Sequence, residues 1–320
     1  MGLRLDGFEF MGVHYDIYSE GAVFGWVEDD VWMIQETVPY GDKEVPVVCV
    51  SNISEEGFEL PASVQYLGSP IEDYEGYIGY FYNGKNIEIP EQIKYFNCSM
   101  SDSDVESFKI LSDKTQVPDY IKGWFINCKS LKTVSLPDTI EGFRGTHKNG
   151  TFEGCESLSE IELPSNLKII GAKTFKDCSS LTNISIPEGV TTIGEEAFAG
   201  TNITSIEYPE GLTCLALNAF SNTSIEELIV PESVTDINGA ISNMPNLKTL
   251  IIPDTITMYK SFSIWNCPSL ELVVFPDTVT DFSIRAESDF DKSKITIKVS
   301  ARIAEYLQEK YPEYNIVAKD

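Results

Sequence analysis

Apolar residues recur along the middle of the chain at an interval that no single helix or strand produces. In FKDCSSLTNISIPEGVTTIGEEAFAG, residues 175–200, they fit neither a helical period nor a long two-residue alternation. Prolines that follow an apolar residue show a longer period, with intervals of 27, 23, 22, 22, 22 and 23 residues. A nearly fixed period of this length indicates a solenoid of stacked repeats. The prolines are Pro137, Pro164, Pro187, Pro209, Pro231, Pro253 and Pro276.

Each repeat divides into two parts. The words before the prolines, such as LKTVSLP and LTNISIP, alternate buried and exposed positions, which predicts a short strand ended by the proline. The words after them, such as EGVTTIGEEAF, carry a second apolar pair, often a glycine, and Ala-Phe. These words predict an extended or turn segment, a bend, and one helical or 3-10 turn. Stacking then buries a continuous core beside a parallel sheet with strands about 4.8 Å apart.

The predicted fold is therefore a repeat solenoid, mainly β, wound as a right-handed superhelix with a cap at each end. Period-two alternation near the N-terminus predicts a β cap. At the C-terminus the spacing of Ile303, Leu307 and Tyr311 predicts a capping helix, followed by a last strand YNIVA. The expected parts are the β cap at 1–46, the solenoid at 47–284 (degenerate over 47–124, regular over 125–276) and the C-terminal cap at 285–320.

Four of the seven cysteines occupy one slot of the repeat, where other repeats carry Thr201, Thr223 and Met244. A slot shared by Cys, Thr and Met requires a small or adaptable buried side chain rather than a thiolate. A metal cluster would need a second ligand type or a Cys-x-x-Cys word, and the sequence has neither at this slot. Seven is odd, so no disulfide framework is predicted. The four are Cys128, Cys155, Cys178 and Cys267, and the isolated ones are Cys49, Cys98 and Cys214.

The repeat words resemble the BspA-like, Treponema-type class of leucine-rich repeat, closely over 125–276 and more loosely over 47–124. Its consensus is close to Cys-x-x-Leu-x-x-Ile-x-Leu-Pro-x-x-Leu-x-x-Ile-Gly-x-x-Ala-Phe. The resemblance implies a bacterial protein, secreted or attached to the cell surface, in a family with members implicated in adhesion to host matrix proteins or other cells. The family shares no catalytic residue. The words VTDINGAISNM and ITMYKSFSIWNC depart from the pattern, which leaves the convex side near residues 238–265 open.

The net charge and the short apolar runs of the chain limit the classes of partner that it can bind. The 320-residue chain has a formal net charge of −27, which argues against nucleic acid or an anionic membrane as partner. Solubility accounts for this charge, and attraction of a basic partner or of divalent cations is the alternative. The longest apolar runs, such as VPVVCV, are far shorter than the ~20 residues of a membrane span, so no membrane insertion is expected. The N-terminal stretch has no signal-peptide pattern, and a chain with its signal removed would look the same.

No word for a catalytic serine, a zinc protease, a P-loop or a dinucleotide fold occurs in the chain. His14 and His147 are the only histidines, and His147 is expected to be solvated within the insertion RGTHKNGT. The word SDSDVES spaces Asp102, Asp104 and Glu106 like the opening of a calcium loop, yet it lacks the turn glycine and the distal glutamate. We therefore expect an acidic loop, no metal, no cofactor and no enzyme.

The outward positions of the predicted strands are polar in the earlier repeats and turn aliphatic in the last ones. The apolar strip of Ile229, Ile251, Leu272 and Val274 would lie in adjacent rows about 5 Å apart. Larger apolar patches mark interaction sites. Three interpretations stay open: the C-terminal cap covers the strip, a partner or a second copy binds it, or it is merely exposed.

The insertion IEDYEGYIGYFYNG is a second candidate site, through Tyr77, Tyr80 and Tyr82. Tyrosine-rich loops make good binding surfaces, and a carbohydrate could stack there. The alternative is that these rings pack on the β cap.

The sequence thus predicts a non-enzymatic binding protein, outside the cell or on a bacterial surface, that recognises a protein partner through its sheet face. One alternative is an assembly scaffold in which the apolar strip serves homo-oligomerisation. A further alternative is a glycan-binding protein.

Overall fold

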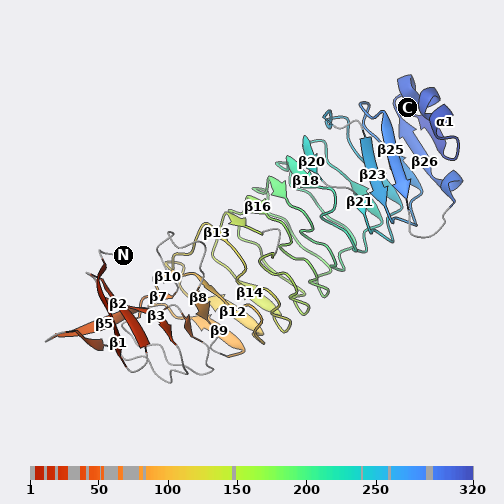
Figure 1. Cartoon of the computed structure of the whole chain (residues 1–320). Helices are drawn as coiled ribbons and strands as arrows, with labels where there is room; N and C mark the ends of the chain where they lie inside the picture. Colours follow the sequence, from red (N-terminus) through yellow and green to blue (C-terminus); the bar gives the residue numbers. More distant parts are fainter. Residues whose placement is uncertain are drawn as a thin grey trace.

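In the computed structural model the chain is a parallel-strand β-solenoid of about ten turns, whose coils follow one another from the N-terminal to the C-terminal end (Figure 1). The structure describes residues 64–67, 84–145, 149–237, 241–258, 261–285 and 291–319 with side chains, and the backbone alone of 4–10, 13–18, 21–27, 37–40, 43–50, 52–53, 79–81 and 238.

The chain opens with antiparallel strands, as the period-two alternation predicts. The opening strands are β1 (Arg4–Phe10), β2 (Val13–Tyr18), β3 (Gly21–Val27), β4 (Thr37–Tyr40), β5 (Lys43–Val50), β6 (Asn52–Ile53), β7 (Tyr66–Leu67), β8 (Gly79–Phe81), β10 (Tyr95–Phe96) and β11 (Cys98–Ser99). Pairing is antiparallel for β1–β2–β3 and parallel for β3–β5–β7–β10 and β6–β8–β11. The first sheet therefore continues from the opening strands into the first coils, and the boundary expected after residue 46 falls within β5.

The strands predicted before the prolines lie in two separate parallel ladders. One joins β9 (Asn86–Ile89), β12 (Ser107–Ile110) and β14 (Thr133–Ser135), and the other joins β19 (Glu227–Ile229), β22 (Thr249–Ile251), β24 (Leu272–Val274), β26 (Thr296–Val299) and β27 (Asn315–Ala318). Besides the strands that precede prolines, the ladders contain β12, β26 and β27.

The continuous sheet expected on this side is interrupted, because three intervening repeats carry no strand at 159–164, 182–187 and 201–209. The interrupted words read EIE, NIS and SIE, whereas β19, β22 and β24 read ELI, TLI and LVV, which are richer in aliphatic and β-branched residues. Single backbone hydrogen bonds join the interrupted repeats, as from Asn202 N to Leu181 O (2.9 Å).

A further ladder runs through the interrupted region on the second apolar pair of each repeat. Its strands are β13 (Tyr120–Ile121), β15 (Gly142–Phe143), β16 (Ile169–Ile170), β17 (Thr192–Ile193), β18 (Cys214–Ala216) and β20 (Asp236–Asn238), all parallel. The extended segment predicted after each proline is therefore a strand that links neighbouring coils.

The Ala-Phe words form single turns of the 3-10 type, as expected, closed by bonds between residues three apart such as Cys178 N to Phe175 O (3.1 Å). A 3-10 turn, η1 (Lys292–Lys294), occurs after the last repeat. Where the Ala-Phe word fails, a fourth ladder of repeat strands replaces the turns: β21 (Ile241–Ser242), β23 (Ser261–Trp265) and β25 (Asp281–Arg285). Ile241, Ile264 and Ile284 pair there, and β-branched residues favour strands.

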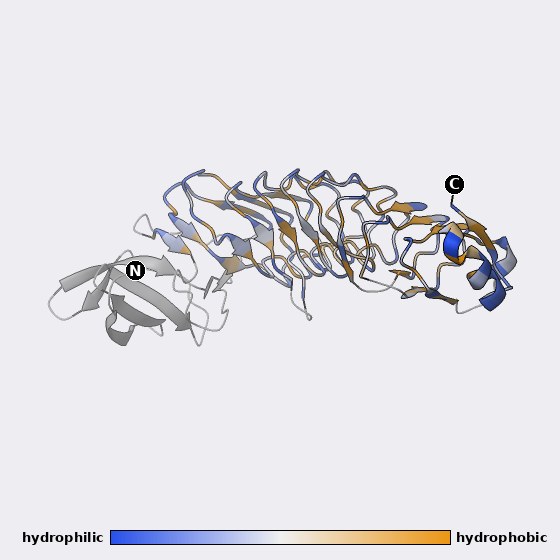
Figure 2. Ribbon diagram, turned by 90° about the horizontal axis from the view of Figure 1, so that it is seen from above, coloured by the Kyte–Doolittle hydropathy of each residue, from blue (hydrophilic) through white to orange (hydrophobic). Residues whose placement is uncertain are grey.

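Buried side chains stack in columns along the coils, and Figure 2 shows hydrophobic segments on the inside with hydrophilic ones at many outer bends. In the column of the Ala-Phe position, five fully buried rings lie with successive centroids 5.2, 5.3, 5.5 and 5.7 Å apart. The column therefore joins each coil to the next through aromatic contact in addition to burial. The five are Phe125, Phe152, Phe175, Phe198 and Phe220.

The cysteine slot is buried, as predicted, and its thiols are free. Three of the thiols donate to a carbonyl of the preceding repeat, as from Cys178 Sγ to Phe152 O (3.1 Å). Burial raises the pKa of Cys128 and of Cys267 to about 11, and it raises the pKa of Cys155 and of Cys178 as well. The slot therefore holds neutral thiols that pack and donate.

The residue before this slot adopts a left-handed backbone in successive repeats, with φ between 52° and 77°. Its N–H donates to a carbonyl of the next repeat, as from Asp177 N to Ala199 O (2.8 Å). Asn, Asp and Gly tolerate this conformation better than other residues, which explains the composition of the position. The residues are Asn127, Gly154, Asp177, Gly200, Asn222, Asn243 and Asn266.

We expect Asn222→Val to lower the free energy of unfolding by about 1–2 kcal/mol, because a β-branched residue is strained at positive φ. Asn222→Gly, the matched control, should cost much less, since the Asn222 side chain is exposed and glycine adopts this φ freely. Chemical denaturation followed by circular dichroism measures both variants. Equal destabilisation by Val and Gly would contradict the backbone explanation.

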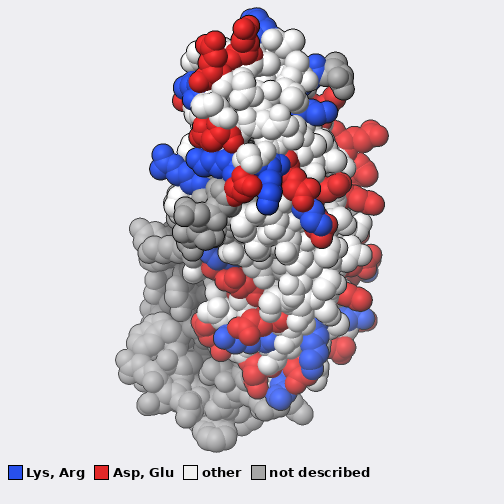
Figure 3. All heavy atoms as spheres, turned by 90° about the vertical axis from the view of Figure 1, so that its right-hand side faces the viewer, with Lys and Arg blue, Asp and Glu red and all other residues white. Residues whose placement is uncertain are grey.

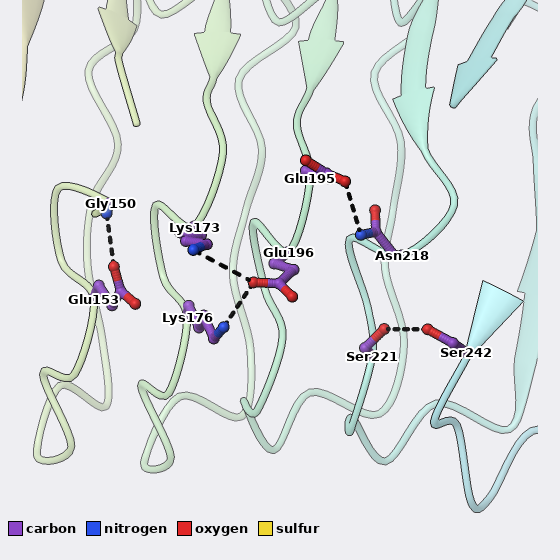
Figure 4. A network of polar contacts seen from close by, with 9 residues as sticks. All are labelled: Gly150, Glu153, Lys173, Lys176, Glu195, Glu196, Asn218, Ser221 and Ser242. Atoms are coloured by element: carbon purple, nitrogen blue, oxygen red, sulfur yellow. Dashed lines mark hydrogen bonds and ion pairs between the residues drawn. The ribbon is translucent and has the colours of Figure 1, made fainter. Parts of the chain in front are cut away.

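Polar side chains also connect neighbouring turns (Figure 4). Glu196 accepts Lys176 Nζ at 2.6 Å and lies 4.0 Å from Lys173 Nζ. Asn218 Nδ2 donates a hydrogen bond to Glu195 Oε1 (3.4 Å), which joins the next pair of coils. Ion pairs near the surface contribute ~0–1 kcal/mol each, so these partly buried contacts adjust the stacking rather than drive it.

The C-terminal cap is a helix followed by a strand, as predicted. α1 (Ala301–Lys310) connects β26 to β27, which pair in parallel. Leu307 is fully buried, and Ile303 and Tyr311 pack against the core. The Tyr311 ring lies 4.4 Å from the Phe282 ring of β25, so the predicted face of the helix closes the last coil.

Asp281 of β25 anchors this helix. Its carboxylate accepts hydrogen bonds from the Tyr311 hydroxyl and from Lys310 Nζ (3.0 Å). These bonds, with that of Tyr311 the larger, hold the pKa of Asp281 below its ordinary value of 3.8. Because the folded pKa is lowered, the anchor stabilises the cap above pH ~4 and is lost as the pH falls through the folded pKa.

We therefore expect the amide protection factors of α1 to fall as the pH drops below about 4, by a small amount because Asp281 is half exposed. Asp281→Asn should show the reduced protection already at pH 6 and less change on acidification. Hydrogen exchange by mass spectrometry measures both. An acid response of α1 that is identical in the variant would show that other carboxylates carry it.

Candidate protein-binding face

The ladder from β19 to β27 presents two rows of outward side chains. In-register parallel pairing places neighbours of a row about 4.8 Å apart. The first row is Glu227, Thr249, Leu272, Thr296 and Asn315, and the second row is Ile229, Ile251, Val274, Lys298 and Val317.

The predicted apolar strip lies on this face. Ile229 is 49% exposed, and Ile251, Leu272 and Val274 are half-buried. The strip spans both rows, with Leu272 in the first and the other three in the second. The residue between the two rows of each strand is buried, for example Leu250, so the chain alternates as a half-buried strand should.

The C-terminal cap extends this face instead of covering Ile229. β26 and β27 continue the ladder, and α1 packs at the end of the solenoid through Leu307 and Tyr311. Lys298 and Val317 also belong to the second row, which the proline words do not predict, because no proline follows TIKV and NIVA. The alternation of NIVA carries the signal that could have placed them.

Acidic side chains border the face without ion partners. Glu207 and Glu227 are exposed, and neither forms an ion pair with any residue that the structure describes. Glu226 by contrast pairs with Lys248 (2.7 Å). Acidic side chains also crowd one border of the view in Figure 3. The face therefore combines aliphatic residues with exposed carboxylates that form no ion pair among the described residues, and Glu227 acts on Lys248 only through its charge.

A side chain of α1 covers part of the outer edge of β27. In the parallel pairing, Asn315 N and Lys319 N donate toward β26, so Ile316 N points to the outer edge. Ile316 N donates to Gln308 Oε1 (3.0 Å), and Gln308 Nε2 donates to Tyr314 O (3.1 Å). The Gln308 amide thus occupies two backbone groups that an added strand would use.

The repeat pattern and its solenoid identify the family. The model described as BspA type leucine rich repeat region, with six copies, matches residues 49–180, 120–241 and 168–296. The chain belongs to the BspA-type leucine-rich repeat family. No curated protein matches this sequence.

Three solved structures resemble this BspA-type protein. A leucine-rich repeat protein from Bacteroides ovatus has a TM-score of 0.52 and 19% identity, with 98% of this chain and 99% of that chain covered. A leucine rich cell surface protein from Faecalibacterium prausnitzii has a TM-score of 0.38 and 16% identity, with coverage of 92% and 76%. The Treponema pallidum leucine-rich repeat protein has a TM-score of 0.35 and 20% identity, with coverage of 74% and 87%. The first similarity supports the solenoid fold, and the other two are too distant to add to it.

The other sites predicted from the sequence are described only in part, or have side chains that already pair with neighbours. Tyr77, Tyr82 and His147 lie outside the described residues, as do the side chains of Tyr80 and His14. In the acidic loop, Glu106 pairs with Lys132 (2.7 Å) and Lys85 (3.4 Å). Asp102 accepts Asn127 Nδ2 (2.8 Å).

The described residues contain no group of three or more His, Cys, Asp or Glu side chains arranged to hold a metal ion. The helix described in this part of the chain is too short and too polar to cross a membrane.

Proposed function

We propose that this protein is a non-enzymatic binding module, secreted or on a bacterial surface, that recognises a protein partner through the two rows of its C-terminal sheet. The observation that carries the proposal is the apolar strip, which remains at the surface although the C-terminal cap lies next to it. Membership of the BspA-type family supports both the protein-binding role and the location.

A self-associating scaffold is the alternative, and the same strip favours it. A scaffold would bury Ile229 and Ile251 against a second copy, whereas a receptor would leave them free for a foreign partner. Burial of apolar area stabilises either complex, so the area itself does not separate the two functions.

The test compares the wild type with the double variant Ile229→Glu/Ile251→Glu. We expect both to be monomeric by light scattering across concentration and equally stable, because these side chains face outward. On a panel of immobilised host matrix proteins, the wild type should bind at least one member and the double variant should bind at least tenfold more weakly, as desolvating two carboxylates opposes apolar contact.

The control is Thr133→Glu/Ser135→Glu, which places two carboxylates at the two exposed outward positions of β14, away from the apolar strip. This control should bind like the wild type. A wild-type dimer that the strip variant alone dissociates would replace the receptor with the scaffold. An unfolded strip variant would show that the strip is core, and the site would be withdrawn.

A further inference from the structure

We infer that the second row docks an amphipathic helix of the partner protein, with basic residues at one end of that helix and acidic residues at the other. This inference rests on the proposed function and specifies the segment that the face recognises. It follows from the order of charges along the row, the spacing of the strands, and the partly covered edge of β27.

Opposite charges lie at the two ends of the aliphatic stretch. Glu207 precedes Ile229 by one repeat of 22 residues, and a hydrogen bond from Ser224 N to Ile203 O (3.1 Å) joins these two coils. Glu227 lies beside Ile229 on the same strand. At the far end, Lys298 follows Val274 in register.

The charges at the two ends form no ion pair with a described residue, although Glu227, after Glu226, helps to raise the pKa of Lys248. Among the described residues, Glu207, Glu227 and Lys298 form no ion pair, whereas Lys319 at the border of the same sheet contacts both Asp254 (2.6 Å) and Asp277 (3.0 Å). Lys298 is half-buried between two valines of the row, Val274 and Val317. Its cation is therefore placed to meet a carboxylate of a ligand that packs on these valines.

The spacing fits a helix lying along the solenoid axis. Ile229, Ile251 and Val274 follow one another at about 4.8 Å. Residues three or four apart on a helix advance by about 4.5–6 Å, so the i, i+3 or i+4, and i+7 positions meet the three aliphatic side chains in turn. Three strand spacings from Ile229 to Lys298, about 14 Å, correspond to about ten helical residues.

Gln308 opposes the other common mode of peptide capture at the edge of the sheet, because it bonds two backbone groups of this edge. An extended segment added beside β27 would have to displace Gln308 from Ile316 N and Tyr314 O. A partner therefore meets side chains of the face rather than backbone of the edge. The net charge of −27 attracts its basic end from a distance, and Lys298 fixes where its acidic end lies.

The test uses three synthetic helical peptides of about 14 residues that share one leucine stripe. The first has lysines at one end and glutamates at the other, the second has lysines throughout, and the third has glutamates throughout. Fluorescence anisotropy at about 0.15 M ionic strength measures their affinities, because screening there limits the long-range attraction between the net charge of −27 and the all-lysine peptide. We expect the bipolar peptide to bind about fivefold more tightly than the all-lysine peptide, with the all-glutamate peptide weakest and the differences shrinking in high salt.

In the Lys298→Glu variant the preference for the bipolar peptide over the all-lysine peptide should reverse, so that the all-lysine peptide binds more tightly. Lys109→Glu is the matched control, because Lys109 occupies the corresponding outward position of β12 and is exposed. It should leave the order unchanged. A wild type that does not prefer the bipolar peptide, or a Lys298→Glu variant that keeps the wild-type order, would overturn the inference.

The outcome separates this inference from the proposed function. If the peptides bind without charge preference and Ile251→Glu abolishes their binding, the face binds protein and only the charge order is wrong. If no peptide binds, the inference is overturned, and the panel of matrix proteins decides the proposed function independently.

Discussion

Phe175→Ala is expected to lower the free energy of unfolding by about 3–5 kcal/mol. The Phe175 ring is fully buried and stacks on Phe152 (5.3 Å) and on Phe198 (5.5 Å). Its removal opens a cavity between three coils and breaks three aromatic contacts at once, the third being an edge contact with Phe143 (6.2 Å). Each coil is stabilised only by its neighbours, so weakening two interfaces in the middle of the solenoid affects the whole.

Chemical denaturation measures the loss, and hydrogen exchange locates it. Protection should fall first in β16 and β17, the strands nearest to Phe175 in sequence. Phe175→Leu is the control, since it keeps much of the apolar volume and should cost considerably less. A loss below about 1 kcal/mol for the alanine variant would mean that the column can collapse around the cavity.

Gly171→Ala is expected to destabilise by about 1–3 kcal/mol or more, although Gly171 has no unusual φ. A Cβ at this position would lie 2.2 Å from Phe143 O and 2.8 Å from Gly145 N. Both contacts are backbone atoms of the preceding coil, which cannot rotate away. The two coils would have to separate, and the β15–β16 pairing would weaken with them.

Gly211→Ala tests whether any glycine in a repeat would behave in this way. The nearest atom to its Cβ is Glu188 O at 3.6 Å, an ordinary contact. We expect this variant to match the wild type or to be slightly more stable, because alanine restricts the unfolded chain. Melting temperatures of the two variants decide the point, and equal losses would refute the close-contact explanation.

The architecture was predictable wherever one residue type recurs at one slot. The period of the prolines predicted the coils, and the slot shared by Cys, Thr and Met predicted buried thiols. The spacing of Ile303, Leu307 and Tyr311 predicted the buried face of the last helix. Each of these follows from burial, which the hydrophobic pattern records directly. The apolar strip was predictable for the same reason, since its residues occupy outward positions of strands already defined.

Hydrogen bonding between coils was harder to predict. The words EIE, NIS and SIE match the repeat pattern as well as their neighbours do, yet they form no ladder, because pairing depends on the adjacent coils as well as on the word itself. The position with positive φ could not be predicted from the hydrophobic pattern. Asn, Asp and Gly, which occupy it, are not related by hydrophobicity and share only their tolerance of positive φ. Lys298 and Val317 could not be placed from the repeat pattern, since no proline ends their strands as it ends the others.

The two hydrogen bonds between Gln308 and the edge of β27, here called the glutamine clamp, restrict where a repeat can be added to this protein. A new coil placed between two existing ones meets the same slots above and below, and it leaves Gln308 on Ile316 and Tyr314. A coil placed beyond β27 would have to remove the clamp and supply a new one. Duplication of an interior repeat is therefore the low-cost way to make a longer or shorter version of this molecule, and α1 with β27 would travel unchanged at the end of every length variant.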